Sequence, residues 1–238
     1  MSSFIIKIIA LLAMLVDHTT KIIGSRFLLL YLIGRISFPL FAFQTTIGYA
    51  KTKNVNKYLL RLLIFALISE IPYQIFINQI TERNDISLNI FFTICLGVIC
   101  MYIYDLDIKK DFHREKRFLY NSLKVIVIFF IIVFAKYINV DYGIFGVFLI
   151  LFIHILYNKN KILFSIGYIY LITIEYINSF FYIVPFNYFI AMLIGGYIPL
   201  IFMLLYNGKK GVGLKYLFYI FYPVHLTILV VINLIFLK

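Results

Sequence analysis

Several residues that could take part in acid–base chemistry stand inside apolar stretches of this chain. The first pair, Asp17 and His18 in "AMLVDHTTKIIG", ends the apolar run "FIIKIIALLAMLV". Histidine can act as a general base near neutral pH, and a neighbouring carboxylate raises its basicity or fixes its tautomer. We therefore expect acid–base chemistry centred on His18 and supported by Asp17. Other ionisable residues in apolar stretches are Arg35, Glu70, Glu175 and His225.

The composition places these residues in a membrane protein. Of 238 residues, 63% are hydrophobic and only 13% are charged, and the mean hydropathy is +1.00. Too few polar residues remain to cover a water-soluble globule of this size. The net charge is +12, but the basic residues lie between apolar runs and form no soluble basic domain, which argues against nucleic acid as a partner. The spacing of Cys95 and Cys100 fits neither a metal pair nor a redox motif, so we expect no metal.

The apolar runs predict an all-α, polytopic transmembrane helical bundle that forms one integral-membrane domain over residues 1–238. Roughly 20 mainly apolar residues cross the hydrocarbon core, which gives about nine spans. Eight and ten spans are the alternatives, because the sixth is short. No small-residue cleavage site follows the first span, so we expect it to be retained. The predicted spans are 4–23, 27–50, 58–78, 88–104, 118–138, 142–157, 162–181, 184–206 and 214–236.

Lysine and arginine gather in alternate loops, which predicts the orientation of the chain. With nine spans, all the basic loops fall on one side, so we expect a cytoplasmic amino terminus and an external carboxyl terminus. Abundant Ile, Lys and Asn are typical of an AT-rich bacterial genome, so the expected location is the bacterial inner membrane. The basic loops contain Lys51, Lys53 and Lys57, the run 109–117, Lys159 and Lys161, and Lys209, Lys210 and Lys215.

The depth of each ionisable residue follows from the helical rise of about 1.5 Å per residue. Asp17 and His18 lie roughly 20 Å from the cytoplasmic end of the first span, and Arg35 lies roughly 12 Å below the outer surface. The same count brings Glu70, Glu175 and His225 to a similar layer. Ionisable groups are costly in hydrocarbon unless they face a partner or a water-filled cavity. The sequence therefore predicts a shared polar chamber in the outer half of the membrane.

Some of these residues also have a purely structural interpretation. Asp17 and Arg35 could form a buried ion pair that fixes the register of two helices, with His18 capping it. His225 could be a histidine that hydrogen-bonds between helices. Two further histidines, His154 near the end of the sixth span and His113 in a basic loop, are expected to be solvated or to snorkel.

A second informative segment is "LLYNGKKGVGLKYLFYIFYPVH". Its Asn-Gly turn, two lysines and further glycines lead into a helix on the cytoplasmic side. Backbone amides, close approach and positive charge suit a phosphate-rich ligand. The alternative is a basic loop that only satisfies the positive-inside rule.

Several blocks of the sequence together resemble a known family. They are "KIIALLAMLVDH", "IGRISFPLFAFQTTIGYAKTKNVNKYLLRLLIFALISEIPYQ", "LNIFFTICLG", "VDYGIFGV" and "LLYNGKKG...KYLFYIFYPVHL", and they run in order from Lys7 to Leu226. They look like the signature blocks of the TraX family, which is named for the protein that acetylates the amino terminus of F-type pilin and is grouped with the acyltransferase-3-like membrane proteins.

The resemblance implies a polytopic acetyltransferase that takes acetyl-CoA from the cytoplasm and serves an acceptor at the outer side of the membrane. His18 matches a first-helix histidine that acts as a base or acetyl relay in related enzymes. Arg35 matches the arginine of the "GR-FP" block. Residues 207–211 match the "YNGK-G" block and are the candidates for binding the phosphates of CoA.

These inferences combine into one predicted mechanism. His18, supported by Asp17, deprotonates an acceptor amine or hydroxyl or carries the acetyl group, while Arg35 neutralises Asp17 or a developing oxyanion. Expected partners are acetyl-CoA, a protein amino terminus or glycan, and the lipid bilayer. The predicted catalytic set is His18, Asp17, Arg35, Glu70 and His225, and the predicted acetyl-CoA-binding set is Asn207, Gly208, Lys209, Lys210 and Gly211.

Two other classes of protein fit the same residues. A proton-coupled transporter also needs buried ionisable groups and proline-broken helices near the membrane midplane, although no inverted repeat is detectable. A non-enzymatic component of a conjugation or secretion apparatus needs only the packing, and leaves the clustered charges unexplained.

Overall fold

The structure is a computed structural model that describes residues 1–24, 27–81, 86–107, 114–181, 185–213 and 215–236. Within these ranges every regular element is a helix, and the only β pairing is an isolated bridge between Leu88 and Val140. The helices are α1 (Ser3–Ile23), α2 (Leu28–Arg35), α3 (Ser37–Ala50), α4 (Val55–Thr81), α5 (Ile90–Asp105), α6 (Arg114–Tyr137), α7 (Gly143–Leu156), α8 (Lys161–Phe181), α9 (Phe186–Leu204) and α10 (Lys215–Phe236).

Each predicted span coincides with helix, so the all-α polytopic bundle is confirmed. The second span differs in one respect, because it is divided at Ile36 into α2 and α3. Pro39 lies in the first turn of α3, where a missing amide hydrogen breaks no hydrogen bond within the helix. Among the described residues, six helical regions are long and apolar enough to cross a membrane. Helices α5 and α7 are apolar but shorter, at 16 and 14 residues.

The described parts of the basic loops lie at one end of the bundle, which we name the basic end. The amide of Ser3 donates to the carbonyl of Lys209 (2.9 Å), and Lys51 Nζ donates to the carbonyl of Gly208 (3.0 Å). These contacts join the amino terminus, the α3–α4 loop and the α9–α10 loop. The ring of His154 at the end of α7 contacts that of Tyr49 near the end of α3, with centroids 5.3 Å apart.

The opposite end of the bundle, which we name the far end, is held together by two other loops. The amide of Leu88 donates to the carbonyl of Asn139 (2.9 Å), and the amide of Asp141 donates to the carbonyl of Leu88 (2.8 Å). These bonds tie the segment before α5 to the segment before α7. Tyr142, the N-cap of α7, has a left-handed backbone with φ 61°, which L-residues seldom adopt.

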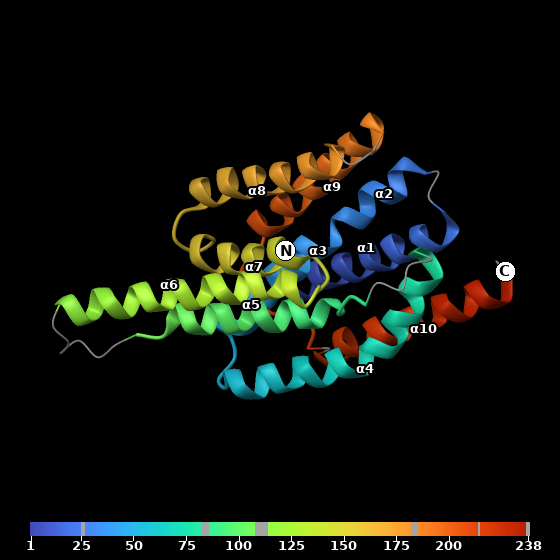
Figure 1. Ribbon diagram of the computed structural model, residues 1–238. Helices are drawn as coiled ribbons and strands as arrows, with labels where there is room; N and C mark the ends of the chain where they lie inside the picture. The colour runs from blue at the N-terminus through green and yellow to red at the C-terminus, as the bar shows by residue number, and fades with distance from the viewer. Residues whose placement is uncertain (25–26, 82–85, 108–113, 182–184, 214, 237–238) are drawn as a thin grey trace.

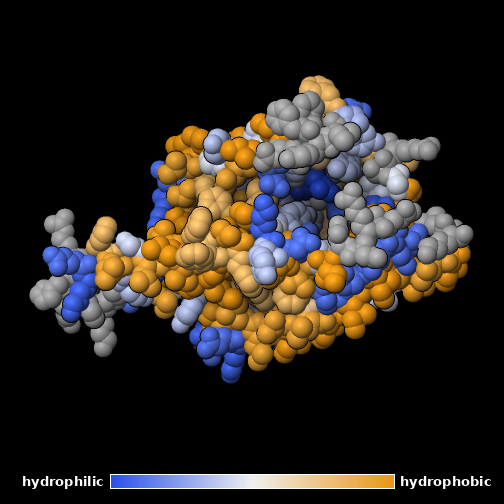
Figure 2. All heavy atoms as spheres, in the orientation of Figure 1, coloured by the Kyte–Doolittle hydropathy of each residue, from blue (hydrophilic) through white to orange (hydrophobic). Residues whose placement is uncertain are grey.

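Helix α1 lies inside the bundle and packs against α2, α3 and α10 (Figure 1). Its buried side chains include the polar residues Asp17, His18 and Thr20. Helices α8 and α9 run side by side on one flank, and α4 and α10 pack together on another (Figure 1). Figure 2 shows a mainly hydrophobic face, as a lipid-facing surface requires, with a hollow lined by hydrophilic residues near α1 and α2.

Candidate functional site

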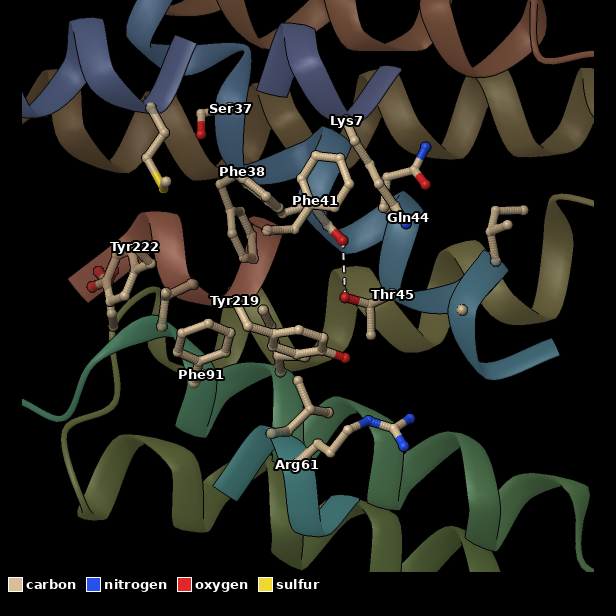
Figure 3. Close-up of a pocket in the computed structure, with 18 of the residues that line it drawn as sticks. Lys7, Ser37, Phe38, Phe41, Gln44, Thr45, Arg61, Phe91, Tyr219 and Tyr222 are labelled. Atoms are coloured by element: carbon tan, nitrogen blue, oxygen red, sulfur yellow. Dashed lines mark hydrogen bonds between the residues drawn. The ribbon is translucent and has the colours of Figure 1, made fainter. Parts of the chain in front are cut away.

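A cavity of about 470 Å³ lies between α1, α3, α4, α5 and α10. Helix α1 lines it with one face, through residues three or four positions apart. Basic-end residues such as Lys51 and far-end residues such as Asp141 both line it, so the cavity extends between the two ends. Figure 3 shows Lys7 of α1 and Gln44 of α3 on one wall, Arg61 of α4 on another, and aromatic rings between them. The lining residues of α1 are Ser3, Lys7, Met14, Asp17, His18 and Lys21.

Two histidines from opposite ends of the chain form a hydrogen-bonded pair beside this cavity. His18 Nδ1 lies 2.7 Å from His225 Nε2, and His225 Nδ1 lies 2.7 Å from the carbonyl oxygen of Phe221. A carbonyl oxygen can only accept a hydrogen bond, so His225 Nδ1 carries the proton. Neutral His225 then accepts at Nε2, and His18 donates from Nδ1. Neutral His18 therefore keeps an unprotonated Nε2, which is the atom a general base needs.

The pair is enclosed by aromatic side chains. The ring of His18 meets Phe76 edge to face with centroids 5.0 Å apart, and it lies 6.2 Å from the ring of Tyr222. His18 and His225 are only 8% and 4% exposed. Of the two histidines, only His18 lines the cavity, and His225 lies behind it. His18 is thus the histidine that a molecule in the cavity could reach, and His225 contacts His18 from behind.

Asp17 forms ion pairs with two cations. It accepts a close hydrogen bond from Arg35 of α2, and its other carboxylate oxygen lies 2.7 Å from Lys21 Nζ. Gly34 permits this approach, because a Cβ there would lie 2.6 Å from Asp17 Oδ1. His18 is hydrogen-bonded to His225, whereas Asp17 forms the ion pair with Arg35 that the structural interpretation of the sequence expected. The physical reason is that successive side chains on a helix point about 100° apart.

Glu70 lies outside the cavity lining. Its carboxylate accepts hydrogen bonds from Gln74 Nε2 (2.6 Å) and Asn89 Nδ2 (2.6 Å), and Asn89 is the N-cap of α5. A carboxylate beside a helix N-terminus is stabilised by the helix dipole, so Glu70 fixes the start of α5. Glu175 of α8 also lies outside the lining. The structure therefore does not bring either glutamate to the chamber, because depth along a span says nothing about the direction of the side chain.

Only Lys210 of the expected phosphate-binding loop lines the cavity. Asn207 Oδ1 accepts a hydrogen bond from the backbone amide of Lys209 (3.1 Å), and this bond stabilises the turn. Gly208 and Gly211 have positive φ values of 76° and 73°, and a Cβ on Gly211 would lie 2.7 Å from Phe4 Cβ. The loop is therefore built to dock on the amino terminus.

Three lysines from separate elements meet where this loop docks, and we name Lys7, Lys51 and Lys210 the lysine cluster. All three line the cavity, and Lys51 and Lys210 lie close enough to repel the charge of Lys7. None pairs with a carboxylate in the described part of the chain. Unopposed cations at a cavity mouth favour an anionic ligand. Sequence reasoning missed Lys7, although its spacing of seven from Met14 and eleven from His18 places it on the same helix face.

The loop before α7 also contributes residues that sequence reasoning missed. Asp141 and Tyr142 line the cavity, and the Tyr142 ring stacks on Phe38 with centroids 3.8 Å apart. Asp141 lies outside the membrane-spanning helices. Burial raises the pKa of its carboxyl to about 6, although the ammonium of Lys21 acts in the opposite direction. Both residues belong to the block "VDYGIFGV", which resembles the family but was not predicted to be part of the site.

The pH dependence of stability is expected to change in Asp141→Asn. A carboxyl with a raised pKa binds more protons in the folded state, so its ionisation lowers stability as pH rises from about 4 to about 6. Asparagine resembles the protonated acid and removes this slope. We expect the variant to melt a few degrees higher than the unmodified protein at pH 7 and by a smaller margin at pH 4.5. Thermal unfolding in detergent at several pH values measures this, and equal slopes for both proteins would contradict it.

The remaining described histidine, His154, does not line the cavity. His154 Nε2 is 2.9 Å from Asp105 Oδ1 at the basic end, so it forms an ion pair when protonated, where solvation or snorkelling was expected. His113 lies outside the described residues. Among the residues whose placement is described, no group of three or more His, Cys, Asp or Glu side chains could hold a metal ion.

The fold and the cavity define an integral membrane protein, an all-helical bundle with a cavity lined by residues of both its ends and a histidine pair beside it. The family model for TraX proteins matches residues 2–233, and the chain belongs to the TraX family. It is similar to the probable fimbrial assembly protein FimC, serogroup H1, of Dichelobacter nodosus. The two are 31% identical over 247 residues, which cover 96% of this chain and 94% of that protein. No solved structure matches the chain.

Proposed function

We propose that this protein is a membrane-embedded acetyltransferase that moves an acetyl group from acetyl-CoA at the basic end to an amine or hydroxyl acceptor at the far end. The observation that carries the proposal is His18, which lines a cavity that extends between the two ends and whose hydrogen bond to His225 through Nδ1 leaves Nε2 unprotonated. Membership of a family named for a pilin-acetylating protein supports this chemistry.

The lysine cluster is the proposed site for the phosphates of acetyl-CoA. This site replaces the one expected in the loop 207–211, and Lys210 is the residue common to both. From Lys7 to His18 the helix rises about 16 Å, so phosphates at the cluster leave an extended pantetheine arm to reach toward His18. Arg61 enters the cavity from α4, and its Nε has no hydrogen-bond partner among the residues that are described. It offers a further donor to an anionic ligand.

The proposed reaction uses His18 as the general base. Its Nε2 removes a proton from the acceptor, and the acceptor nitrogen or oxygen forms a bond to the thioester carbonyl carbon. The carbon–sulfur bond then breaks, and the CoA thiolate takes up the proton that His18 removed, which returns His18 to its neutral form. His225 holds His18 in the required tautomer throughout.

The proposed direction of transfer follows from charge. Basic loops face the cytoplasm in bacterial inner-membrane proteins, which puts the lysine cluster on the side where acetyl-CoA is made. The far end then faces outward, where a pilin-type amino terminus or an envelope glycan would be the acceptor. The similarity to a protein named for fimbrial assembly supports a pilus-related acceptor.

The proposal is tested by adding acetyl-CoA to the purified protein in lipid nanodiscs and measuring thermal stability and acetyl transfer. We expect acetyl-CoA to stabilise the protein, and Lys51→Glu/Lys210→Glu to weaken its binding about a hundredfold through loss of two cations and gain of two anions. Lys53→Glu is the matched control, because Lys53 is exposed in the same α3–α4 loop but does not line the cavity. Equal loss in the control, or no stabilisation of the unmodified protein, would refute the donor site.

As a second candidate function, the protein would be a non-enzymatic component of a pilus-assembly apparatus. The name of the similar fimbrial assembly protein favours this function. It predicts that His18→Ala leaves pilus assembly intact in cells and that the purified protein transfers no acetyl group. The proton-coupled transporter would instead show proton uptake that depends on a solute and not on acetyl-CoA.

A further inference from the structure

Gln44 of α3 has a buried side-chain amide whose nitrogen lacks a hydrogen-bond partner among the described residues. The side chain is 6% exposed and lines the cavity. Its Oε1 accepts a hydrogen bond from the hydroxyl of Ser3 (2.6 Å). Its Nε2 has no hydrogen-bond partner in the described part of the chain. Leaving a buried hydrogen-bond donor without a partner costs free energy. The amide NH2 of Gln44 is therefore suited to donate a hydrogen bond to an acceptor atom of a ligand.

The position of Gln44 indicates which part of a ligand would meet it. Ser3 places Gln44 next to the first turn of α1, one turn before Lys7 of the lysine cluster. Along α3, Gln44 lies two turns before Lys51. Gln44 therefore lies between Lys51 and His18 along the cavity, and a ligand with phosphates at Lys51 and Lys210 and its reactive end near His18 would pass it with its linking arm.

We propose that Gln44 Nε2 donates a hydrogen bond to an amide carbonyl oxygen in the pantetheine arm of the acyl donor. This inference rests on the proposed function for the identity of the donor. An amide carbonyl is a strong acceptor, and satisfying it inside a low-dielectric cavity is worth more than in water. The contact distinguishes a ligand with an amide-bearing arm from a nucleotide alone. Ser3 acts as a positioning residue, because it holds the amide in place.

The test compares two probes on the purified protein in nanodiscs by calorimetric titration. Coenzyme A carries the arm, and adenosine 3′,5′-bisphosphate carries phosphates without it. We expect Gln44→Leu to weaken coenzyme A about tenfold and to leave adenosine 3′,5′-bisphosphate unchanged. Ser3→Ala is expected to weaken coenzyme A about threefold. Thr45→Val is the matched control, because the neighbouring hydroxyl already donates to the Phe41 carbonyl (2.9 Å), a bond drawn in Figure 3.

Each outcome decides between the alternatives. Unchanged binding of coenzyme A to Gln44→Leu, or equal loss of both probes, overturns the proposal. Retained binding of adenosine 3′,5′-bisphosphate shows that a variant is folded, and Ser3→Ala provides the test if Gln44→Leu is not. If the unmodified protein binds coenzyme A through Gln44 but transfers no acetyl group, the proposed function fails and the donor contact stands. If transfer proceeds and Gln44→Leu binds normally, the contact alone is wrong.

Discussion

Replacing His18 with alanine is expected to lower acetyl transfer about a thousandfold or more, while acetyl-CoA still binds. General-base catalysis typically contributes a factor of about 10² to 10⁴. His18 is the histidine of the pair that lines the cavity, and its unprotonated Nε2 has no substitute on the same helix face. Steady-state transfer from labelled acetyl-CoA to an added acceptor, with the protein in nanodiscs, measures the loss.

His225 provides the matched variants for this prediction. The side-chain amide introduced by His225→Gln would offer a carbonyl oxygen that accepts from His18 Nδ1, so the tautomer survives and we expect a loss of about tenfold or less. His225→Leu offers no acceptor, frees His18 to take either tautomer, and is expected to lose about a hundredfold. A thermal-shift measurement checks that both variants fold. If the glutamine and leucine variants behave alike, the positioning role of His225 is wrong; if His18→Ala retains full activity, the catalytic role of His18 is wrong.

Replacing Arg35 with methionine is expected to destabilise the protein by about 3 kcal/mol. Arg35 is the interhelical partner of Asp17, and the pair joins α1 to α2 at a point where Gly34 allows close contact. Its removal leaves a buried carboxylate with Lys21 as its remaining ion-pair partner in the described part of the chain. Unfolding in a mixed-micelle denaturant series reports the change.

The double variant Asp17→Asn/Arg35→Met separates a lost ion pair from lost packing. Asparagine removes the stranded charge, so we expect the double variant to be more stable than Arg35→Met alone, with a coupling energy of about 1 to 3 kcal/mol. Additive effects would show that the pair contributes no mutual stabilisation. Acetyl transfer by Asp17→Asn then tests whether this pair has only the register-fixing role.

The membrane class and the helices followed from the sequence because hydropathy acts locally. An apolar run of sufficient length must be helical in lipid, where each backbone amide and carbonyl needs a partner within its own segment. The alternation of basic loops likewise predicted that Ser3, Lys51 and Lys209 share one end, as their hydrogen bonds show. The division of the second span at Ile36 was not predicted, because both halves are equally apolar.

The site was predicted only in part. Depth counting found His18, Asp17, Arg35 and His225, and the structure brings these four residues together in two contacts. The same counting also selected Glu70, which the structure places against Asn89 instead. Depth is a single coordinate, and residues at one level can face the cavity, a neighbouring helix or lipid.

The sequence by itself determined a helical membrane protein, its alternating loops and the residues too polar to lie in lipid without a partner. Only the tertiary structure decided which of those residues meet. It joined His18 by a hydrogen bond to His225, 207 positions away along the chain, and placed Asp17 in ion pairs with Arg35 and Lys21. It also gathered Lys7, Lys51 and Lys210 from three elements. The physical reason is that the rotation of each helix is set by packing against all its neighbours at once, and no local pattern encodes that sum.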